Sequence, residues 1–303
     1  MRFELRPVAP FRLDLTAWTL RRDPANTIDR WDGREYRRVV LLDDRPAELA
    51  LRQTGPMERP HLAVEIKGAR PGAKLQSLAA ALLDRLLGLS LDLAEFHQWV
   101  NRQPRLCILG RQFHGLHPPR FPTVWEAAVN AISCQQLSLH VGLTFLSRLA
   151  HRFGPAVGEF HAMPAPQHLA ASATAAKLRA IGYNRNKADA LLRLAGQIAA
   201  GEVDLEGLAA LDDEAAVAAV RHLRGLGTWS AQYILLRGLG RTHILPAGDS
   251  GFQRNLGRWL GGPGQTDPAA VSRAMHRWRA YGGILYFYML LTHLRGQGLL
   301  ENP

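Results

Sequence analysis

The stretch Leu223-Arg-Gly-Leu-Gly-Thr-Trp-Ser-Ala-Gln-Tyr233 decides how this 303-residue chain folds. One helix ends here, two glycines bracket a single leucine, and a second helix begins at once. Glycine permits the left-handed backbone that such a sharp turn needs. The second helix then presents unpaired backbone N–H groups and its positive dipole end at one point. The pattern indicates a phosphate site that reads no base, although a plain helix–turn–helix connection would use the same residues.

An aspartate follows this turn at a separation that suits one helix and a loop. Asp249 lies 22 residues after Gly227, within Leu245-Pro-Ala-Gly-Asp-Ser-Gly251. That separation accommodates one helix and a loop, so we expect Asp249 at the start of the next helix and near the phosphate site. An aspartate before a helix most often acts only as its N-cap. The residues alone leave both roles open.

The first third of the chain has the patterns of a small antiparallel sheet. Apolar residues alternate over 11–15 and over 62–66, which is the two-residue period of half-buried strands. Asp32-Gly33 between them suits a hairpin turn. After Pro71 the period changes to three and four residues, and Leu75 to Leu86 predict a helix.

Nearly everything downstream has helical patterning. Thr123-Val-Trp-Glu126 has the spacing of a capping box, and Ser138 and Asp212 are further candidate N-caps. We expect helices near residues 230–239, 252–260, 268–280 and 284–295. The predicted fold is therefore α+β, with an antiparallel sheet domain over residues 1–95. A helical region follows over 96–303, in which a cleft separates two subdomains and the hairpin occupies 221–231.

Composition narrows the class of protein. Lys and Arg number 37 against 26 Asp and Glu, so the formal net charge of +11 favours a polyanionic partner. Cys107 and Cys134 exclude a disulfide framework and a four-cysteine iron–sulfur cluster, and with His114 and His117 they are spaced too irregularly to favour zinc. Since neither a long apolar run nor a signal peptide is present, we expect a cytoplasmic protein.

Both motifs together resemble the helix-hairpin-helix (HhH-GPD) superfamily of DNA glycosylases, in which a Gly/Pro-rich loop precedes an aspartate. The resemblance extends over Ala128–Ser138, Lys177–Gly182 and Arg277–Gly283, so it covers roughly residues 120 to 295. The nearest branch is the 3-methyladenine DNA glycosylase II type. It implies base-excision repair of damaged duplex DNA by a nucleoid-associated monomer that needs no cofactor.

The resemblance implies that Asp249 is the catalytic carboxylate. Breaking an N-glycosidic bond develops positive charge on the deoxyribose, which a nearby anion stabilises while it orients or deprotonates water. An alkylated purine already carries positive charge and leaves without a strong acid, so one carboxylate suffices where ordinary glycosidases use two.

Position 229 separates the branches of the superfamily. Bifunctional relatives place a Schiff-base lysine there, whereas this chain has Trp229. The resemblance therefore implies a monofunctional enzyme that leaves the abasic site intact. Two alternatives stay open: a bifunctional glycosylase/lyase of the 8-oxoguanine type, and a non-catalytic protein that binds damaged DNA.

An aromatic base pocket is implied as well, formed by Trp229, Tyr233 and Tyr281. Aromatic residues at helical spacing are more often core residues, but a cationic base would stack strongly on their faces. Gln136 occupies the position where the family inserts a wedge into the gap left by the flipped base. It could equally be an exposed helix end.

The remaining implied contacts are with the DNA backbone. They involve Gly225, Gly227, Thr228, Ser230 and Arg254. Arg185 and Lys187 are further candidates, although any single one of these basic residues is more often a solvated surface charge. Relatives often hold Na⁺ or K⁺ on hairpin carbonyls.

In this chain those carbonyls would belong to Arg221, Leu223 and Leu226. Arg224 stands where proline is common, so the hairpin departs from the family pattern at this position. Ser250-Gly251 replaces a bulky aromatic, so the lesions accepted are left open.

Overall fold

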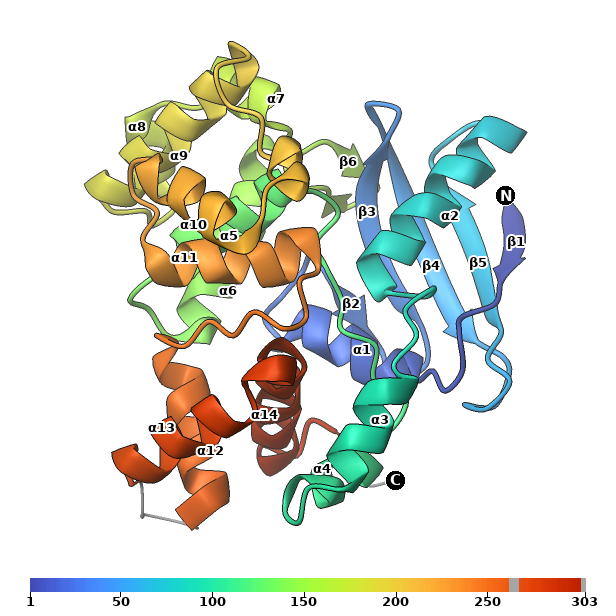
Figure 1. Ribbon diagram of the computed structural model, residues 1–303. Helices are drawn as coiled ribbons and strands as arrows, with labels where there is room; N and C mark the ends of the chain where they lie inside the picture. Colours follow the sequence, from blue (N-terminus) through green and yellow to red (C-terminus); the bar gives the residue numbers. More distant parts are fainter. Residues whose placement is uncertain (262–266, 301–303) are drawn as a thin grey trace.

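The computed structural model describes residues 1–261 and 267–300. An antiparallel sheet begins the chain, with strand order β1-β5-β4-β3-β2 (Figure 1). Its strands are β1 (Arg2–Leu5), β2 (Arg30–Trp31), β3 (Tyr36–Leu42), β4 (Arg45–Gln53) and β5 (Leu62–Lys67). Helix α1 (Leu13–Arg21) precedes β2, and α2 (Ala73–Leu87) follows β5.

Most predictions for this part are confirmed. The strand over 62–66 is β5, and the helix over 75–86 is α2. Asp32-Gly33 does form the turn between β2 and β3, with Gly33 at φ +95°. The connection is longer than a two-residue turn, because the Asp32 side chain accepts hydrogen bonds from the amides of Arg34 and Glu35 before β3 starts.

The strand predicted over 11–15 is wrong, because residues 13–21 form α1. Only three alternating apolar residues supported that strand. The helical period is longer and also present, since the buried residues Leu13, Ala17 and Leu20 recur at four and three positions.

Helices make up most of the remaining chain. They are α3 (Ala94–Asn101), α4 (Leu106–Gln112), α5 (Val124–Cys134), α6 (Leu139–Phe153), α7 (Pro166–Ser172), α8 (Ala175–Ala180), α9 (Arg185–Ala199), α10 (Asp213–His222), α11 (Thr228–Ile234), α12 (Ser250–Gly261), α13 (Pro268–Arg277) and α14 (Gly282–Gly296), with short 3-10 turns η1 (Glu206–Ala210) and η3 (Arg279–Tyr281) and a π-helical turn η2 (Leu235–Leu239). A two-residue strand pair, β6 (Ala156–Val157) and β7 (Phe160–His161), lies between α6 and α7. None of the helices in the described ranges combines the length and apolar character needed to cross a bilayer.

The predicted caps are confirmed. Thr123 accepts a hydrogen bond from the Glu126 amide, Ser138 from the Val141 amide, and Asp212 from the Ala215 amide.

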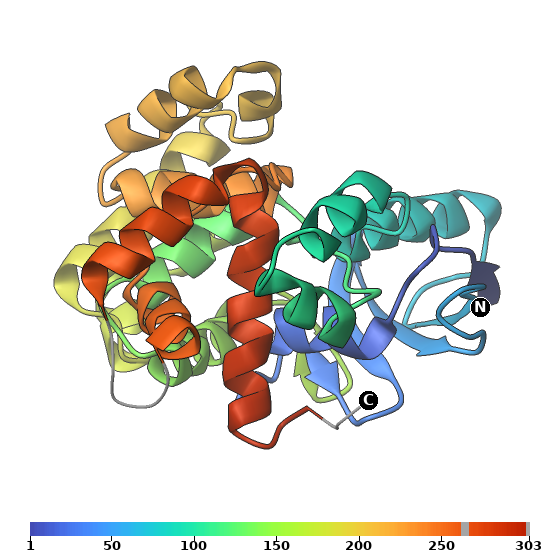
Figure 2. The same cartoon turned by 60° about the horizontal axis from the view of Figure 1, so that its bottom comes forward.

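Two hydrophobic clusters hold the molecule together. One joins the N-terminal sheet, α3 and α4 to the C-terminal helices α12–α14. The other is formed almost entirely by residues 121–234 of the middle of the chain. Figure 2 shows the long α14 standing beside the N-terminal helices, and α1 and α14 are in contact. The two ends of the chain thus share one core, while the predicted boundary at 95/96 stays a prediction.

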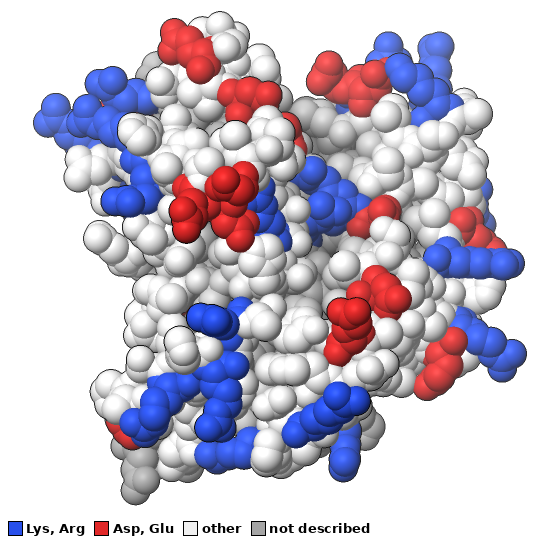
Figure 3. Space-filling view, viewed as in Figure 1, with Lys and Arg blue, Asp and Glu red and all other residues white. Residues whose placement is uncertain are grey.

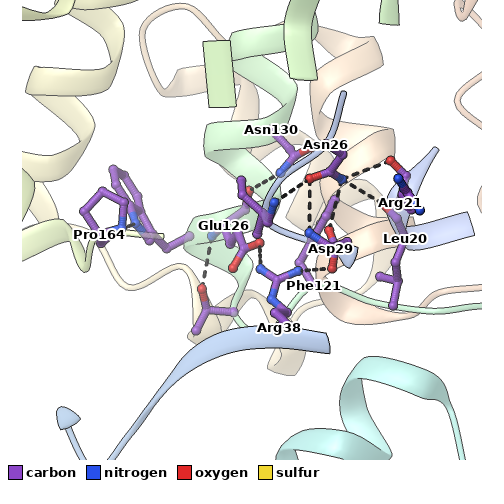
Figure 4. Close-up of polar contacts among 12 residues, drawn as sticks. Leu20, Arg21, Asn26, Asp29, Arg38, Phe121, Glu126, Asn130 and Pro164 are labelled. Carbon is purple, nitrogen blue, oxygen red and sulfur yellow. Dashed lines mark hydrogen bonds and ion pairs between the residues drawn. The ribbon is translucent and has the colours of Figure 1, made fainter. Parts of the chain in front are cut away.

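A buried ionic cluster joins the sheet to the middle helices (Figure 4). Arg38 of β3 is 1% exposed and pairs with Asp29 at 2.5 Å and with Glu126 of α5. Burial alone would raise the pKa of Asp29, but Arg38, the Tyr36 hydroxyl and Arg22 together outweigh it, and the net shift is downward. Burial raises the pKa of Glu126. Because the Glu126 side chain pairs with Arg38, it does not form the second hydrogen bond of the predicted capping box.

Candidate active site

Asp249 is held by three hydrogen-bond donors that carry no charge. Its Oδ1 accepts from the Phe252 amide at 2.8 Å, as in an N-cap of α12. Its Oδ2 accepts from Trp229 Nε1 at 3.2 Å and from the Tyr286 hydroxyl at 3.0 Å. The carboxylate is half-buried, and no Lys or Arg in the described residues pairs with it. Its negative charge is fixed in place without being neutralised.

Aromatic rings from three helices surround this carboxylate. Trp229 and Tyr233 of α11 stack with ring centroids 5.3 Å apart. Phe252 of α12 and Tyr286 of α14 stack at 5.8 Å. One member of each pair donates to Asp249, so the predicted neighbourhood of Trp229, Tyr233 and Asp249 is present in the structure. Flat π faces next to an anion suit a planar, electron-deficient ligand.

Tyr281, the third predicted pocket aromatic, lies elsewhere. Its ring packs on Phe96 at 5.3 Å and Trp99 at 4.8 Å, which are residues of α3. It ends the short turn η3, whereas Tyr286 lies in the second turn of α14. Sequence reasoning missed Tyr286. The first turns of α14 are buried almost all round, so no periodicity showed which of its aromatic residues would reach Asp249.

Behind Tyr233 lies a buried arginine from the N-terminal part of the chain. Arg22 donates to the Tyr233 hydroxyl at 3.0 Å and to Asn130 Oδ1 at 2.7 Å. Burial raises the pKa of Tyr233, so its hydroxyl stays protonated. Because Arg22 supplies the hydrogen that the oxygen accepts, the Tyr233 proton stays available to donate. Sequence reasoning did not connect α1 with the site, and no local motif marks this contact.

The hairpin has the predicted sharp turn, but only one of its glycines needs positive φ. Gly225 lies at φ +88°, and a Cβ there would come within 2.6 Å of the Ala190 Cβ. Gly227 has φ −99° and ψ −172°, which any residue adopts, and a Cβ on it would meet nothing within 4 Å. Gly227 and Thr228 are exposed at the start of α11. Their backbone is therefore open to a ligand.

Two predicted DNA-contacting side chains face inward instead. Ser230 is 1% exposed, and its hydroxyl accepts from Gln135 Nε2 at 2.6 Å. Ser230 is the third residue of α11, a helix that packs on the core, and its side chain points toward that core. The hairpin motif did not indicate this orientation. Lys187, 8% exposed, donates to the carbonyls of Ser133 and Gln135. It is not a solvated surface charge.

The other predicted contacts lie at the surface. Gln136 is exposed just after α5, with φ +54°, and Arg254 is exposed on α12 without an ion-pair partner among the described residues. Figure 3 shows Lys and Arg side chains gathered over α12 and over the α8–α9 end, below and above the hairpin. This face therefore has the charge that a phosphate backbone requires.

The carbonyls predicted to hold a cation lie in and beside the hairpin. Leu223 O already accepts from the Leu226 amide at 3.1 Å, which leaves it one lone pair. Among the described residues, no three His, Cys, Asp or Glu side chains come together as a metal site would require. A cleft of about 440 Å³ between the sheet and the middle helices, lined by Arg38, Trp125 and Met163, does not include Asp249.

Comparison with known proteins places this arrangement in a family. The family model of the HhH-GPD superfamily base excision DNA repair proteins matches residues 129–280, half of the chain. The chain is 31% identical over 223 residues to DNA-3-methyladenine glycosylase 2 of Escherichia coli K12, which covers 73% of this chain and 74% of that protein. It is 25% identical over 199 residues to the DNA-3-methyladenine glycosylase of Bacillus subtilis 168, 63% of this chain.

The alignment spans less than two thirds, 65%, of that Bacillus protein's length. Among solved structures, the 3-methyladenine DNA glycosylase from Archaeoglobus fulgidus superposes with a TM-score of 0.80 at 22% identity, over 98% of this chain and all of that one. At this identity the likeness concerns the fold, which includes the N-terminal sheet as well as the helices. The family match and the Escherichia coli relative show family membership as well as fold: this chain belongs to the HhH-GPD superfamily of base excision DNA repair proteins.

Proposed function

We propose that the protein is a monofunctional DNA glycosylase that hydrolyses the N-glycosidic bond of alkylated bases, of the 3-methyladenine type, flipped out of duplex DNA. The observation that carries the proposal is the Asp249 carboxylate. It is half-buried among aromatic rings, and Trp229 and Tyr286 orient one of its oxygens. Family membership and the names of both aligned relatives agree with a base-excision repair glycosylase.

The chemistry follows from the charge of that carboxylate. As the glycosidic bond lengthens, the deoxyribose takes on positive charge, and an anion near the anomeric carbon stabilises it. Neutral donors orient Asp249 and leave its charge in place, whereas a salt bridge would cancel that charge. The same oxygen pair can position and deprotonate the attacking water, which makes Asp249 the general base. A cationic base is already a good leaving group and needs no acid.

Trp229 supports the monofunctional assignment. An indole is not a nucleophile, and its Nε1 proton is engaged with Asp249. Lys187 is buried against two backbone carbonyls of the α5 end and donates to both. With no amine placed to form a Schiff base at position 229, water is the attacking species and the abasic strand is left unbroken.

DNA would lie across the face that carries the hairpin. The exposed amides of Gly227 and Thr228 would bind a phosphate, Arg254 would contact the backbone, and Gln136 would fill the gap in the duplex. A Na⁺ or K⁺ ion on the carbonyls of the hairpin would add positive charge beside that phosphate. All of these catalytic and DNA-contacting residues belong to one chain, so the enzyme would act as a monomer. It would be associated with the nucleoid, where its substrate lies.

A panel of duplexes tests the proposal. Each duplex carries one modified base, and alkali-labile cleavage scores base release, with borohydride added in parallel. We expect release of 3-methyladenine-type bases, cleavage only after alkali, and no trapped covalent adduct. A trapped adduct would instead establish the bifunctional alternative. Tight binding of an alkylated duplex with no abasic product would establish a non-catalytic damage-binding protein.

A further inference from the structure

The turn that carries Gln136 is held on two sides, by a lysine side chain from another helix and by one of its own side chains. We call residues Cys134–Leu137, between α5 and α6, the wedge turn. Gln136 and Leu137 are exposed at its tip, and Leu137 is one of few large apolar side chains on the described surface. Gln136 lies at φ +54°, a backbone conformation that costs a residue with a Cβ on the order of 1 kcal/mol. Such a turn keeps this shape only if its surroundings fix it.

Lys187 of α9 fixes one side of the wedge turn. Its amine donates to Ser133 O at 2.8 Å and to Gln135 O at 2.7 Å. These carbonyls belong to the C-terminal end of α5, where the helix dipole favours a cation. The Lys187 backbone is itself anchored, because its amide donates to the Asn184 side chain that caps α9. The ammonium group thereby ties α9 to the backbone just before Gln136.

Gln135 fixes the other side, and its partners belong to the hairpin. Its amide nitrogen donates to Gly225 O at 2.9 Å and to Ser230 Oγ at 2.6 Å. Both hydrogens of the amide are therefore used. Gly225 is the left-handed residue of the hairpin turn, and Ser230 lies in the first turn of α11. One side chain thus connects the residue preceding Gln136 to both sides of the hairpin loop.

We propose that Gln135 and Lys187 are positioning residues that hold the wedge turn, Gln135 against the hairpin and Lys187 against α9, so that binding of the backbone phosphate and insertion of Gln136 occur as one rigid movement. This inference rests on the proposed function, and it adds two residues that act through Gln136 without touching the reacting atoms. It accounts for a lysine and a serine that are buried at the DNA-facing side of the molecule. Because insertion depends on angstrom-scale placement, loosening these contacts should slow flipping more than it weakens binding.

The test is a double-mutant cycle of Gln135→Ala and Gln136→Ala. The readouts are the single-turnover rate of base release and the fluorescence rise of 2-aminopurine placed beside the lesion, which reports unstacking. We expect Gln135→Ala to lower both by about tenfold, as loss of two hydrogen bonds allows, and to change the Kd for duplex DNA by less than twofold. In the Gln136→Ala background the same change should have little further effect.

Two more variants complete the experiment. Lys187→Met should reproduce the loss in flipping, whereas Arg193→Met, an exposed position on the same helix, should match the wild type. Equal losses from Gln135→Ala in both backgrounds, or a loss accounted for by a lower Tm, would overturn the positioning role. If the wild type flips the base but releases none, the proposed function fails while the cycle in fluorescence still decides this inference.

Discussion

Two regions of this molecule hold carboxylates in opposite electrostatic surroundings. In the buried ionic cluster, Asp29 and Glu126 share the Arg38 guanidinium and are 2% and 5% exposed. On the hairpin face, Asp249 is half-buried and receives only neutral donors. The first arrangement neutralises charge and joins two parts of the chain. The second leaves charge available beside aromatic rings.

This difference separates residues that hold the fold from residues that act on a ligand. A buried acid with a cationic partner contributes to the structure, and removing one partner leaves the other uncompensated. An acid that keeps its charge at an accessible position adds little to stability, but it can stabilise a developing cation. Substitutions in the cluster should therefore change the free energy of unfolding, and substitutions on the hairpin face should change DNA binding or base release.

Arg38→Met should produce the largest loss of stability. It leaves Asp29 and Glu126 buried without their cation, so we expect the free energy of unfolding to fall by about 3–5 kcal/mol. Urea denaturation followed by circular dichroism measures this. Asp249→Asn is the matched control, because asparagine caps a helix as well as aspartate does, and its midpoint should stay much closer to the wild-type value than that of Arg38→Met. Equal midpoints for both variants would break the comparison.

Acid should also act on the buried part of the chain through His97. Burial, reinforced by His114, lowers the pKa of His97 to about 4, and neither ring nitrogen has a partner among the described residues. Between pH 4 and 6.5 the unfolded state binds the proton more readily. Stability is therefore full above pH 6.5 and decreases by up to about 3 kcal/mol as the pH falls to 4.

His97→Phe should flatten that part of the pH profile of stability, since it keeps an aromatic ring and removes the titrating group. Denaturation midpoints at several pH values between 4 and 7 decide this. A variant profile parallel to that of the wild type would assign the acid sensitivity to other groups.

The two hairpin glycines give a pair with separable effects. Gly225→Ala combines a positive φ with a clash against Ala190, so we expect a loss of about 2 kcal/mol in stability. Gly227→Ala meets nothing within the protein. Its methyl group should leave the Tm unchanged and weaken duplex binding about tenfold, because the backbone there would approach a phosphate. If Gly227→Ala binds the duplex with wild-type affinity in a fluorescence-anisotropy titration, the proposed phosphate contact at Gly227 is wrong.

A smaller effect is expected at Tyr286. Tyr286→Phe deletes one donor to Asp249 and keeps the ring, so the single-turnover rate of base release should fall about tenfold with little change in DNA affinity. Tyr288→Phe on the same helix is the control, since Tyr288 packs against Phe96 and Phe113 in the core. Equal rates for both variants would mean that the Tyr286 hydrogen bond does not orient the carboxylate.

Much of this arrangement could be predicted from local sequence, because caps, turns and helical periods depend on neighbouring residues. The hairpin, the Thr123 cap and the start of α12 near Asp249 are of this kind. Contacts between distant segments have no such signal. Arg22 reaches Tyr233 across 211 positions, and Gln135 reaches Ser230 across 95. The resemblance implied Tyr281, whereas Tyr286 is the residue that reaches Asp249. No periodic pattern marks Tyr286, because α14 is buried on nearly all sides.

The most direct test of the central claim is the single-turnover release of 3-methyladenine by Asp249→Asn, measured with saturating enzyme beside a titration of the same duplex. Asparagine keeps the shape, and its single oxygen can still cap α12. The substitution removes the negative charge and replaces the second oxygen with an NH2 group, which cannot accept from Trp229 and Tyr286. We predict a rate lower by about 1,000-fold or more with a Kd within about twofold of the wild-type value. Release at the wild-type rate would contradict the assignment of Asp249 as the catalytic carboxylate.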